Sequence, residues 1–231
     1  MMRAVVRQPA ARRAAVRSMR ALAVRETGQA GWTLIEMVIV TTIFGLMMAM
    51  GLPMMSGMLA NGRVRTAVDS LQDGLGIAQA EALRRSAPTE LIVLDGDPVR
   101  SNVAAGAQAS GGNWMVRVPA DATRGLASAD FVRGSAAADP GNAATIQNRA
   151  GAIGVAFASN GRVLSSTGGV YAPITAPVVF HVTAQGADRP MCVYVTIGGS
   201  LKTCDPQLAS GDFRACQPAL SAADCPAGGG G

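Results

Sequence analysis

The feature that most constrains this chain of 231 residues is an apolar run near its N-terminus with a single carboxylate inside it. From Trp32 to Leu52 most residues are apolar, and Glu36 is the one charged side chain. As a helix, this run of about 21 residues would span roughly 32 Å, which is enough to cross a hydrocarbon core of about 30 Å. We therefore expect a transmembrane helix over residues 32–57. A carboxylate inside such a helix is costly and predicts a positively charged partner for Glu36.

The positive charge of the chain lies almost entirely before this run. Residues 1–31 hold seven arginines and one acid, a net charge of +6, whereas the whole chain has a net charge of +5. The rest of the chain is therefore close to neutral, with a net charge of −1. Arginines before a membrane helix stay in the cytoplasm, so we expect the body of the protein on the other side.

The residues Gly31-Trp32-Thr33-Leu34-Ile35-Glu36 resemble the class III signal of type IV pilins and pseudopilins. This resemblance implies that a prepilin peptidase cuts between Gly31 and Trp32 and that Trp32 becomes N-methylated. It also implies that Glu36 meets the N-terminal amine of a neighbouring subunit during assembly. Gly45 and Pro53 match positions where the family often has glycine and proline, and we expect them to mark a helix kink because Pro53 cannot donate a helical hydrogen bond.

Two features depart from the family pattern. Tryptophan stands where the first mature residue is usually phenylalanine, and the basic leader of residues 1–31 is long for the family. A start at Met19 would shorten the leader to 13 residues. The resemblance further implies a protein of the inner membrane, with its N-terminus cytoplasmic and its C-terminal domain periplasmic, that later enters a pilus or pseudopilus.

The apolar pattern continues beyond the membrane segment as an amphipathic helix over residues 58–87. Apolar side chains recur at alternating spacings of four and three, which places them on one helix face. We expect a sheet to cover this face, formed by Val64, Val68, Leu71, Leu75, Ala78 and Ala82. Gly74 and Gly76 weaken a helix, so we interpret them as points where the sheet approaches closely. Pro88 should end the helix.

Residues 88–226 show the short apolar runs and turn signals of strands, which predicts one β-rich globular domain. We expect about six or seven mainly antiparallel strands, with a hairpin turn at Asn160-Gly161 and another at Gly198-Gly199. Residues 95–113 and 119–151 are predicted to be long surface loops, and residues 227–231 a disordered tail. The predicted fold class is α+β, pilin-like, with strands near 89–94, 114–118, 153–157, 162–164, 177–182, 191–197 and 200–204.

Within the pilin-like proteins, the body resembles the GspH/FimT group, including FimT/FimU-like minor pilins. The resemblance rests on the stem sequence Gln79-Ala80-Glu81-Ala82-Leu83-Arg84-Arg85, a strand beginning Asn113-Trp114, a hairpin from Phe157 to Arg162, and the cysteine-bearing end of the chain, Cys204-Asp205-Pro206 to Cys216.

All four cysteines, Cys192, Cys204, Cys216 and Cys225, fall in the last 40 residues. An even number of cysteines in an exported domain predicts disulfides. A hairpin register that places Cys192 opposite Cys204 favours the pairs 192–204 and 216–225, while a 204–216 pair stays open. A zinc site is the weaker alternative, since there is no Cys-x-x-Cys, and we interpret His181 as a core residue.

The sequence contains no constellation of catalytic residues, so we expect neither an enzyme nor a cofactor or metal. The leading hypothesis is a minor type IV pilin that helps to initiate assembly at or near the pilus tip. Its partners would be other minor pilins, the major pilin, the prepilin peptidase, the inner-membrane assembly platform and the lipid bilayer. A GspH-like minor pseudopilin of type II secretion is one alternative. A minor pilin that binds DNA for uptake is another, through Lys202 with Arg162, Arg189 and Arg214.

Overall fold

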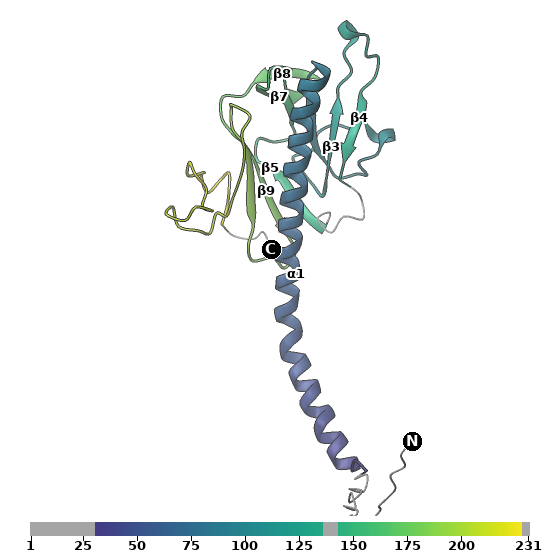
Figure 1. Cartoon of the computed structure of the whole chain (residues 1–231), viewed down its shortest axis with the longest axis vertical. Coiled ribbons are helices and arrows are strands. Elements are labelled where there is room, and N and C mark those ends of the chain that lie inside the picture. The colour runs from purple at the N-terminus through teal and green to yellow at the C-terminus, as the bar shows by residue number, and fades with distance from the viewer. Residues whose placement is uncertain (1–30, 136–142, 228–231) are drawn as a thin grey trace, which may run out of the picture. The chain divides into compact units, whose positions relative to one another are not determined.

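A computed structural model of the chain describes residues 31–135 and 143–227, with the backbone alone at residues 50–54. The chain divides into two compact units, one up to Leu46 and one from Met47, and the long helix α1 (Leu34–Arg85) contributes to both. Most of the expected leader and the tail beyond Ala227 lie outside the described residues. The structure is α+β, as predicted, with one N-terminal helix packed on antiparallel sheets (Figure 1).

Helix α1 is continuous through Gly45 and Pro53. It ends at Arg85, where Ser86 adopts a positive φ of 51° and Ala87 donates its N–H back to the carbonyl of Ala82. The six residues of the predicted apolar face are all buried, at 1% exposure or less.

The described part of the chain forms eleven strands, more than the predicted six or seven. The first sheet has the order β4-β3-β1-β6-β7-β8 and the second the order β11-β10-β9-β5-β2, with antiparallel pairing throughout. The strands are β1 (Thr89–Leu94), β2 (Ser110–Gly111), β3 (Asn113–Val118), β4 (Asp130–Gly134), β5 (Ala144–Asn148), β6 (Gly154–Phe157), β7 (Val163–Thr167), β8 (Val170–Pro173), β9 (Val178–Ala184), β10 (Met191–Val195) and β11 (Leu201–Cys204).

The predicted loops 95–113 and 119–151 are therefore not wholly irregular. They hold β2, β4 and β5, together with short 3-10 helices at Arg100–Asn102 and Ala122–Arg124. Strand β5 pairs with β9 along its full length and buries Ala144, Ile146 and Asn148. Ile146 is the one strong strand former among these three buried residues, which explains why the sequence pattern did not predict the strand.

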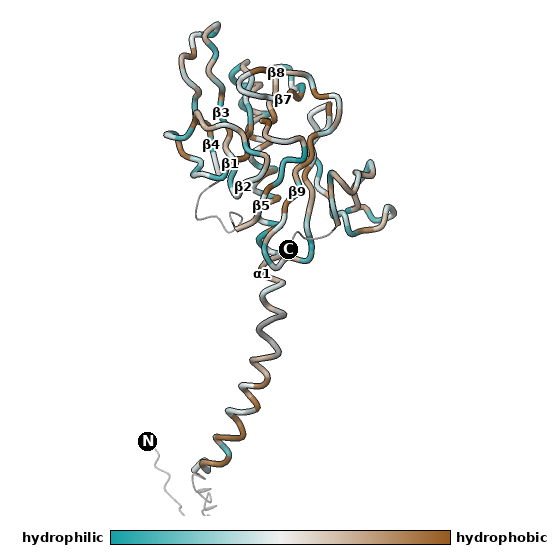
Figure 2. Tube along the Cα trace, turned by 180° about the vertical axis from the view of Figure 1, so that it is seen from behind, coloured by the Kyte–Doolittle hydropathy of each residue, from teal (hydrophilic) through white to brown (hydrophobic). Residues whose placement is uncertain are grey.

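The main core lies between α1 and both sheets. The buried face of α1 packs with side chains from β1, β3 and β6 of one sheet and from β5, β9 and β10 of the other. In Figure 1 α1 runs in front of the strands, and in Figure 2, seen from the opposite side, the strands of both sheets lie in front of α1. The cover that the sequence predicted for the helix face is thus supplied by two sheets.

Candidate functional site

The N-terminal motif forms the first turn of α1. Thr33 precedes the helix, and its Oγ1 accepts a hydrogen bond from the N–H of Glu36 at 3.3 Å. A threonine followed three residues later by a glutamate is the sequence pattern of a capping box, and the threonine half of that box is formed here. A carboxylate in the first turn is also favoured by the helix dipole. Glu36 is exposed, and the described residues place no cation within ion-pair distance of its carboxylate. Among the described residues, the start of the helix explains the position of Glu36 in part, and no ion pair there explains its charge.

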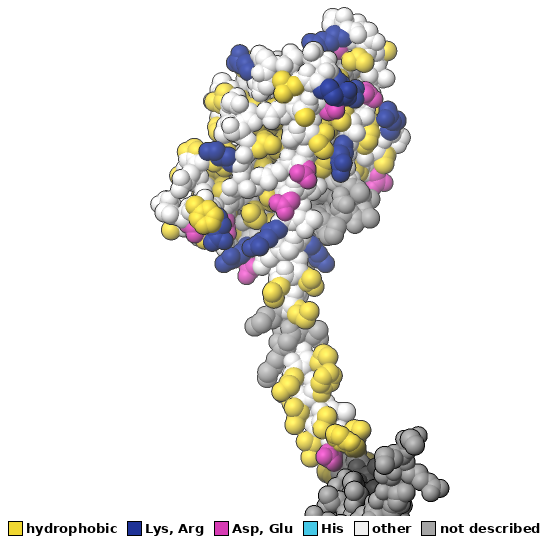
Figure 3. Space-filling model, in the orientation of Figure 1, with side chains coloured by type: hydrophobic (Ala, Val, Ile, Leu, Met, Phe, Trp, Pro, Cys, Tyr) yellow, Lys and Arg dark blue, Asp and Glu magenta, His cyan; other side chains and the backbone are white. Residues whose placement is uncertain are grey.

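The helix around Glu36 exposes a band of large apolar side chains, which are yellow in Figure 3. The same stretch of helix is coloured mostly brown, for hydrophobic residues, in Figure 2. The side chain of Trp32 is 65% exposed and that of Leu34 is 83% exposed. Further members of this apolar band are Ile35, Met37, Val38, Ile39, Val40, Ile43, Phe44, Leu46, Met47 and Met48. Exposed apolar area of this extent is unusual for a free helix in water and indicates burial against other molecules.

The hydroxyls within this band are satisfied by the helix itself. Thr41 donates to the carbonyls of Met37 and Val38, and Thr42 donates to those of Val38 and Ile39. Over the residues that the structure describes, no helix meets the joint requirements of length and apolarity for crossing a membrane. The transmembrane segment expected over 32–57 is therefore not confirmed and stays a prediction, as do the cleavage after Gly31 and the methylation of Trp32.

An ion-pair network joins the end of the stem helix to β4. Glu81 accepts hydrogen bonds from Arg84 at 2.6 Å and from Arg85 at 2.7 Å, and these bonds lower the pKa of Glu81 to about 2. Arg85 also donates to Asp130 at 2.6 Å, with Arg100 on the same carboxylate. The stem sequence that carries the family resemblance therefore has a local structural role, since it fixes the helix end to the first sheet.

The four residues predicted to contact DNA form two groups. Arg162 and Lys202 come shortly after two neighbouring turns, since a Cβ on Gly199 would lie 2.9 Å from the carbonyl oxygen of Gly161. Arg189 and Arg214 line a different site, a cavity of about 490 Å³ beside α1. All four side chains are exposed, but they do not surround one cavity as a single predicted patch would.

The cavity beside α1 brings together cations and one aromatic ring. Arg65 of α1 joins Arg189 and Arg214, and the 90% exposed ring of Phe213 lies 5.5 Å from the guanidinium carbon of Arg214. Asp69 and Asp205 also line it, which offsets most of the positive charge. Arg65 could not be predicted as part of this site, because an exposed arginine on a helix carries no signal of what folds beside it.

The cysteines all form disulfides, but the favoured pairing was wrong. Cys192 does lie opposite Cys204 in the β10–β11 register, as predicted. The disulfide bonds, however, are Cys192–Cys225 and Cys204–Cys216. Of these, the 204–216 bond is the alternative that the sequence left open. The chain after β11 folds back along it, with Asp205 donating its N–H to the carbonyl of Arg214 at 2.9 Å, so that Cys216 reaches Cys204. Because a disulfide sulfur is not a thiolate ligand, this pairing does not support the zinc alternative.

The end of the chain covers part of the second sheet. Cys225 packs in a small core with Val179, Cys192 and Tyr194, and the hydroxyl of Tyr194 donates to the carbonyl of Gln217. His181 lies opposite Cys192 on the neighbouring strand and is 3% exposed, in agreement with its predicted core position. Burial lowers the pKa of His181.

A buried ion pair in the first sheet was not predicted. Glu90 of β1 is 1% exposed and accepts a hydrogen bond from Arg117 of β3 at 2.7 Å. Arg117 also donates to the carbonyls of Val103 and Ala105, which holds the 95–113 segment on the sheet. The sequence does show an acidic residue in one apolar strand, Glu90, and a basic residue in another, Arg117. Predicting that they pair requires the register of the two strands, which the sequence does not provide.

A comparison with solved structures found similar chains. Two crystal structures of the type IV minor pilin FimU from Pseudomonas aeruginosa (strain PAO1) are similar to the chain. One, in space group P65, is 15% identical, with a TM-score of 0.42 over 60% of this chain and 90% of FimU. The other, in space group P21, is 14% identical, with a TM-score of 0.43 over 61% of this chain and 87% of FimU.

No family model and no curated protein matches the chain. The long N-terminal helix packed on antiparallel sheets is the arrangement of elements that we expected from the sequence.

Proposed function

We propose that the protein is a minor type IV pilin, a structural subunit that enters a filament through the N-terminal half of α1. The observation that carries this proposal is the exposed apolar band from Trp32 to Met48 with Glu36 in its first turn. Packed against the helices of neighbouring subunits, this band would lose its contact with water, and Glu36 would acquire a cationic partner.

The sequence of events in this proposal follows the N-terminal motif. The subunit is held in the inner membrane through residues 32–57, with its body in the periplasm, until prepilin peptidase cuts after Gly31. The amine of Trp32, methylated or not, then meets Glu36 of a neighbouring subunit. The platform in the inner membrane adds the subunit with other minor pilins at or near the tip, ahead of the major pilin.

Substitutions at two positions test this function. Gly31→Ala should leave an uncleaved precursor, while the matched change Gly28→Ala should be processed normally. Glu36→Ala should be cleaved but poorly incorporated, as measured by immunoblotting of sheared filaments against whole cells. If both Gly31→Ala and Glu36→Ala enter filaments normally, the proposal fails.

Glu36→Gln separates the assembly role from the helix-capping role. Glutamine can occupy the third position of a capping box but carries no charge. We expect Glu36→Gln to be excluded from filaments as strongly as Glu36→Ala. Normal incorporation of Glu36→Gln would assign Glu36 to helix capping alone, and Glu26→Ala, which changes a carboxylate in the leader, serves as the control.

The alternative machine is a type II secretion pseudopilus, which shares the same N-terminal chemistry. Deletion of the gene distinguishes the two machines, because a minor pilin is required for surface pili and a pseudopilin for release of secreted proteins. Loss of pili with normal secretion supports the pilus, and the reverse result supports the pseudopilus.

DNA binding is a second candidate function, favoured by the three arginines and the exposed Phe213 around one cavity. Cations that neutralise phosphates supply most of the affinity for DNA, and aromatic rings can stack on exposed bases. A mobility-shift titration of the full chain at low salt tests it. A shift that is lost in Lys202→Ala assigns binding to the hairpin, a shift lost in Arg189→Ala assigns it to the cavity, and the absence of any shift rejects this function.

A further inference from the structure

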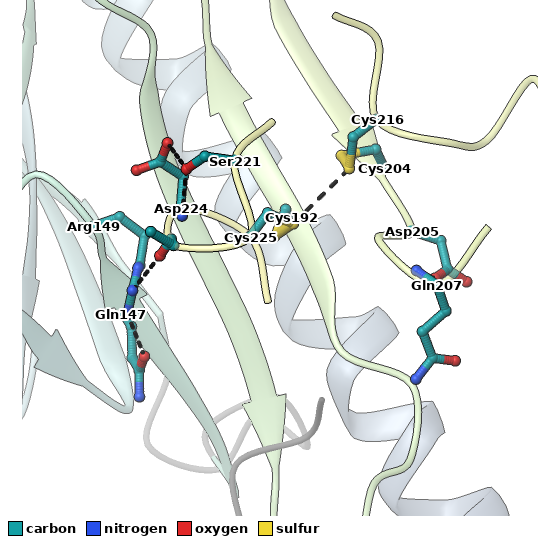
Figure 4. Close-up of a disulfide and its surroundings, with 11 residues drawn as sticks. Gln147, Arg149, Cys192, Cys204, Asp205, Gln207, Cys216, Ser221, Asp224 and Cys225 are labelled. Carbon is teal, nitrogen blue, oxygen red and sulfur yellow. Dashed lines mark hydrogen bonds between the residues drawn. A yellow bond between two sulfur atoms is a disulfide. The ribbon is translucent and has the colours of Figure 1, made fainter. Parts of the chain in front are cut away.

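The two disulfides lie so close together that their four sulfur atoms form one cluster. The Sγ of Cys216 is 3.9 Å from the Sγ of Cys225, the contact drawn as a dashed line in Figure 4. The sulfurs of Cys204, Cys216 and Cys225 all lie within 4.8 Å of one another, and Cys192 is bonded to Cys225. A sulfur of each disulfide is thus in contact with a sulfur of the other.

Access to this sulfur cluster is not equal for its members. Cys192, Cys204 and Cys225 are buried, at 0%, 2% and 5% exposure, whereas Cys216 is only partly buried. Cys216 also lines a surface cavity of about 220 Å³, together with Cys225 and apolar side chains that include Leu208 and Leu220. A thiol reagent from outside would therefore reach the cluster at Cys216.

We propose that Cys216 is a site of thiol–disulfide exchange that accepts a dithiol and passes the exchange on to Cys225. One thiolate of the dithiol attacks Cys216, which breaks the Cys204–Cys216 bond and leaves Cys204 as a thiolate. The second thiol of the dithiol then releases Cys216 as a thiolate and closes the dithiol into a disulfide. This stage transfers two electrons to the protein, and such exchange is carried by the thiolate form.

The second stage takes place within the sulfur cluster. The Cys216 thiolate attacks the sulfur of Cys225, so that a Cys216–Cys225 bond forms, the Cys192–Cys225 bond breaks, and Cys192 leaves as a thiolate. Cys192 and Cys204 then face each other across β10 and β11. A disulfide-type oxidant that removes two electrons can join them, which completes an isomerisation with no net change in oxidation state.

The two pairings restrain the chain differently. The observed bonds span 33 and 12 residues and tie the segment after β11 to the second sheet at two points. In the exchanged form, the 192–204 bond would link β10 and β11, which are already hydrogen-bonded to each other. The 216–225 bond would lie within the segment after β11. Because a cross-link restrains more when it closes a longer loop, the exchange would free residues 205–227 from the sheet.

Peptide mapping of a Cys204→Ser variant tests the proposal. This substitution leaves Cys216 as a free thiol beside the intact Cys192–Cys225 bond. After alkylation of the full-length protein under non-reducing conditions, we expect peptides joined through 216–225 as well as through 192–225, with alkyl groups shared between Cys192 and Cys216. Recovery of the 192–225 pair alone would overturn the proposal. The double variant Cys204→Ser/Cys216→Ser, in which only 192–225 can form, calibrates the mapping.

Partial reduction of the unsubstituted protein provides a second test that does not depend on a variant folding. With less than one equivalent of dithiothreitol, we expect the Cys204–Cys216 bond to be lost first and the 216–225 peptide to appear before free thiol accumulates at both Cys192 and Cys225. Loss of the two native bonds without any 216–225 peptide would contradict exchange within the cluster.

Discussion

The indole ring of Trp114 lies against Gly74, and this contact joins the first sheet to the stem helix. A Cβ on Gly74 would come within 2.8 Å of the Cζ3 atom of Trp114. The indole nitrogen donates a hydrogen bond to Ser70 Oγ at 3.1 Å, one turn earlier on α1, and Trp114 is 3% exposed. The absence of a side chain at residue 74 therefore makes room for the largest residue of β3.

Substitution of this glycine should destabilise the protein. Gly74→Ala places a methyl group against a ring that is fixed by its own hydrogen bond, and such overpacking costs about 1–3 kcal/mol. Gly76→Ala is the matched control, because a Cβ there meets no atom within 4 Å. It should stabilise the helix by up to about 1 kcal/mol. Urea unfolding of both variants measures the difference between their free energies of unfolding. Equal effects of the two substitutions would contradict the prediction, because they would show that Trp114 moves aside at little cost.

The buried ion pair between Glu90 and Arg117 gives a second prediction. Arg117→Met leaves the carboxylate of Glu90, whose side chain is 2% exposed, without its cation. Removal of one partner of a buried pair costs about 3–5 kcal/mol, measurable as a lower midpoint of chemical unfolding. The double variant Glu90→Leu/Arg117→Met should recover most of the loss. If it does not, the cost lies in the bonds from Arg117 to Val103 and Ala105.

Stability should depend on pH through His181, the one histidine of the chain. Burial lowers the pKa of His181 in the folded state below that in the unfolded state. The unfolded chain then binds more protons, so the free energy of unfolding falls as the pH drops below about 6.5, by at most about 1.4 kcal/mol per pH unit. His181→Gln should remove this slope between pH 7 and 5.5. Identical slopes in the two proteins would contradict the prediction.

How much could be predicted from the sequence differs between the stem and the body. The face of α1 was predictable residue by residue, because helical spacing alone determines which side chains share a face. Gly74 was correctly interpreted as a point of close approach to a sheet. Gly76 lies two residues further on, about 200° around the helix axis, and faces open space. A glycine by itself does not indicate which side of the helix will be covered.

In the body, sequence patterns located strands but not their partners. Strand β5 was not predicted, because two of its three buried residues, Ala144 and Asn148, are weak strand formers. It also depends on pairing with β9, which lies far along the chain. The disulfides show the same limit. The register of Cys192 and Cys204 was correct, but their bonds depend on how residues 205–227 fold over the sheet, and no local pattern specifies that path.

The most direct test of the proposed function is the mass of the protein recovered from sheared, purified filaments. We predict that the protein is present as a minor component whose N-terminal peptide begins at Trp32, with or without one added methyl group. Its presence with residues before Trp32 intact, or its complete absence from filaments of cells that express it, would contradict the account.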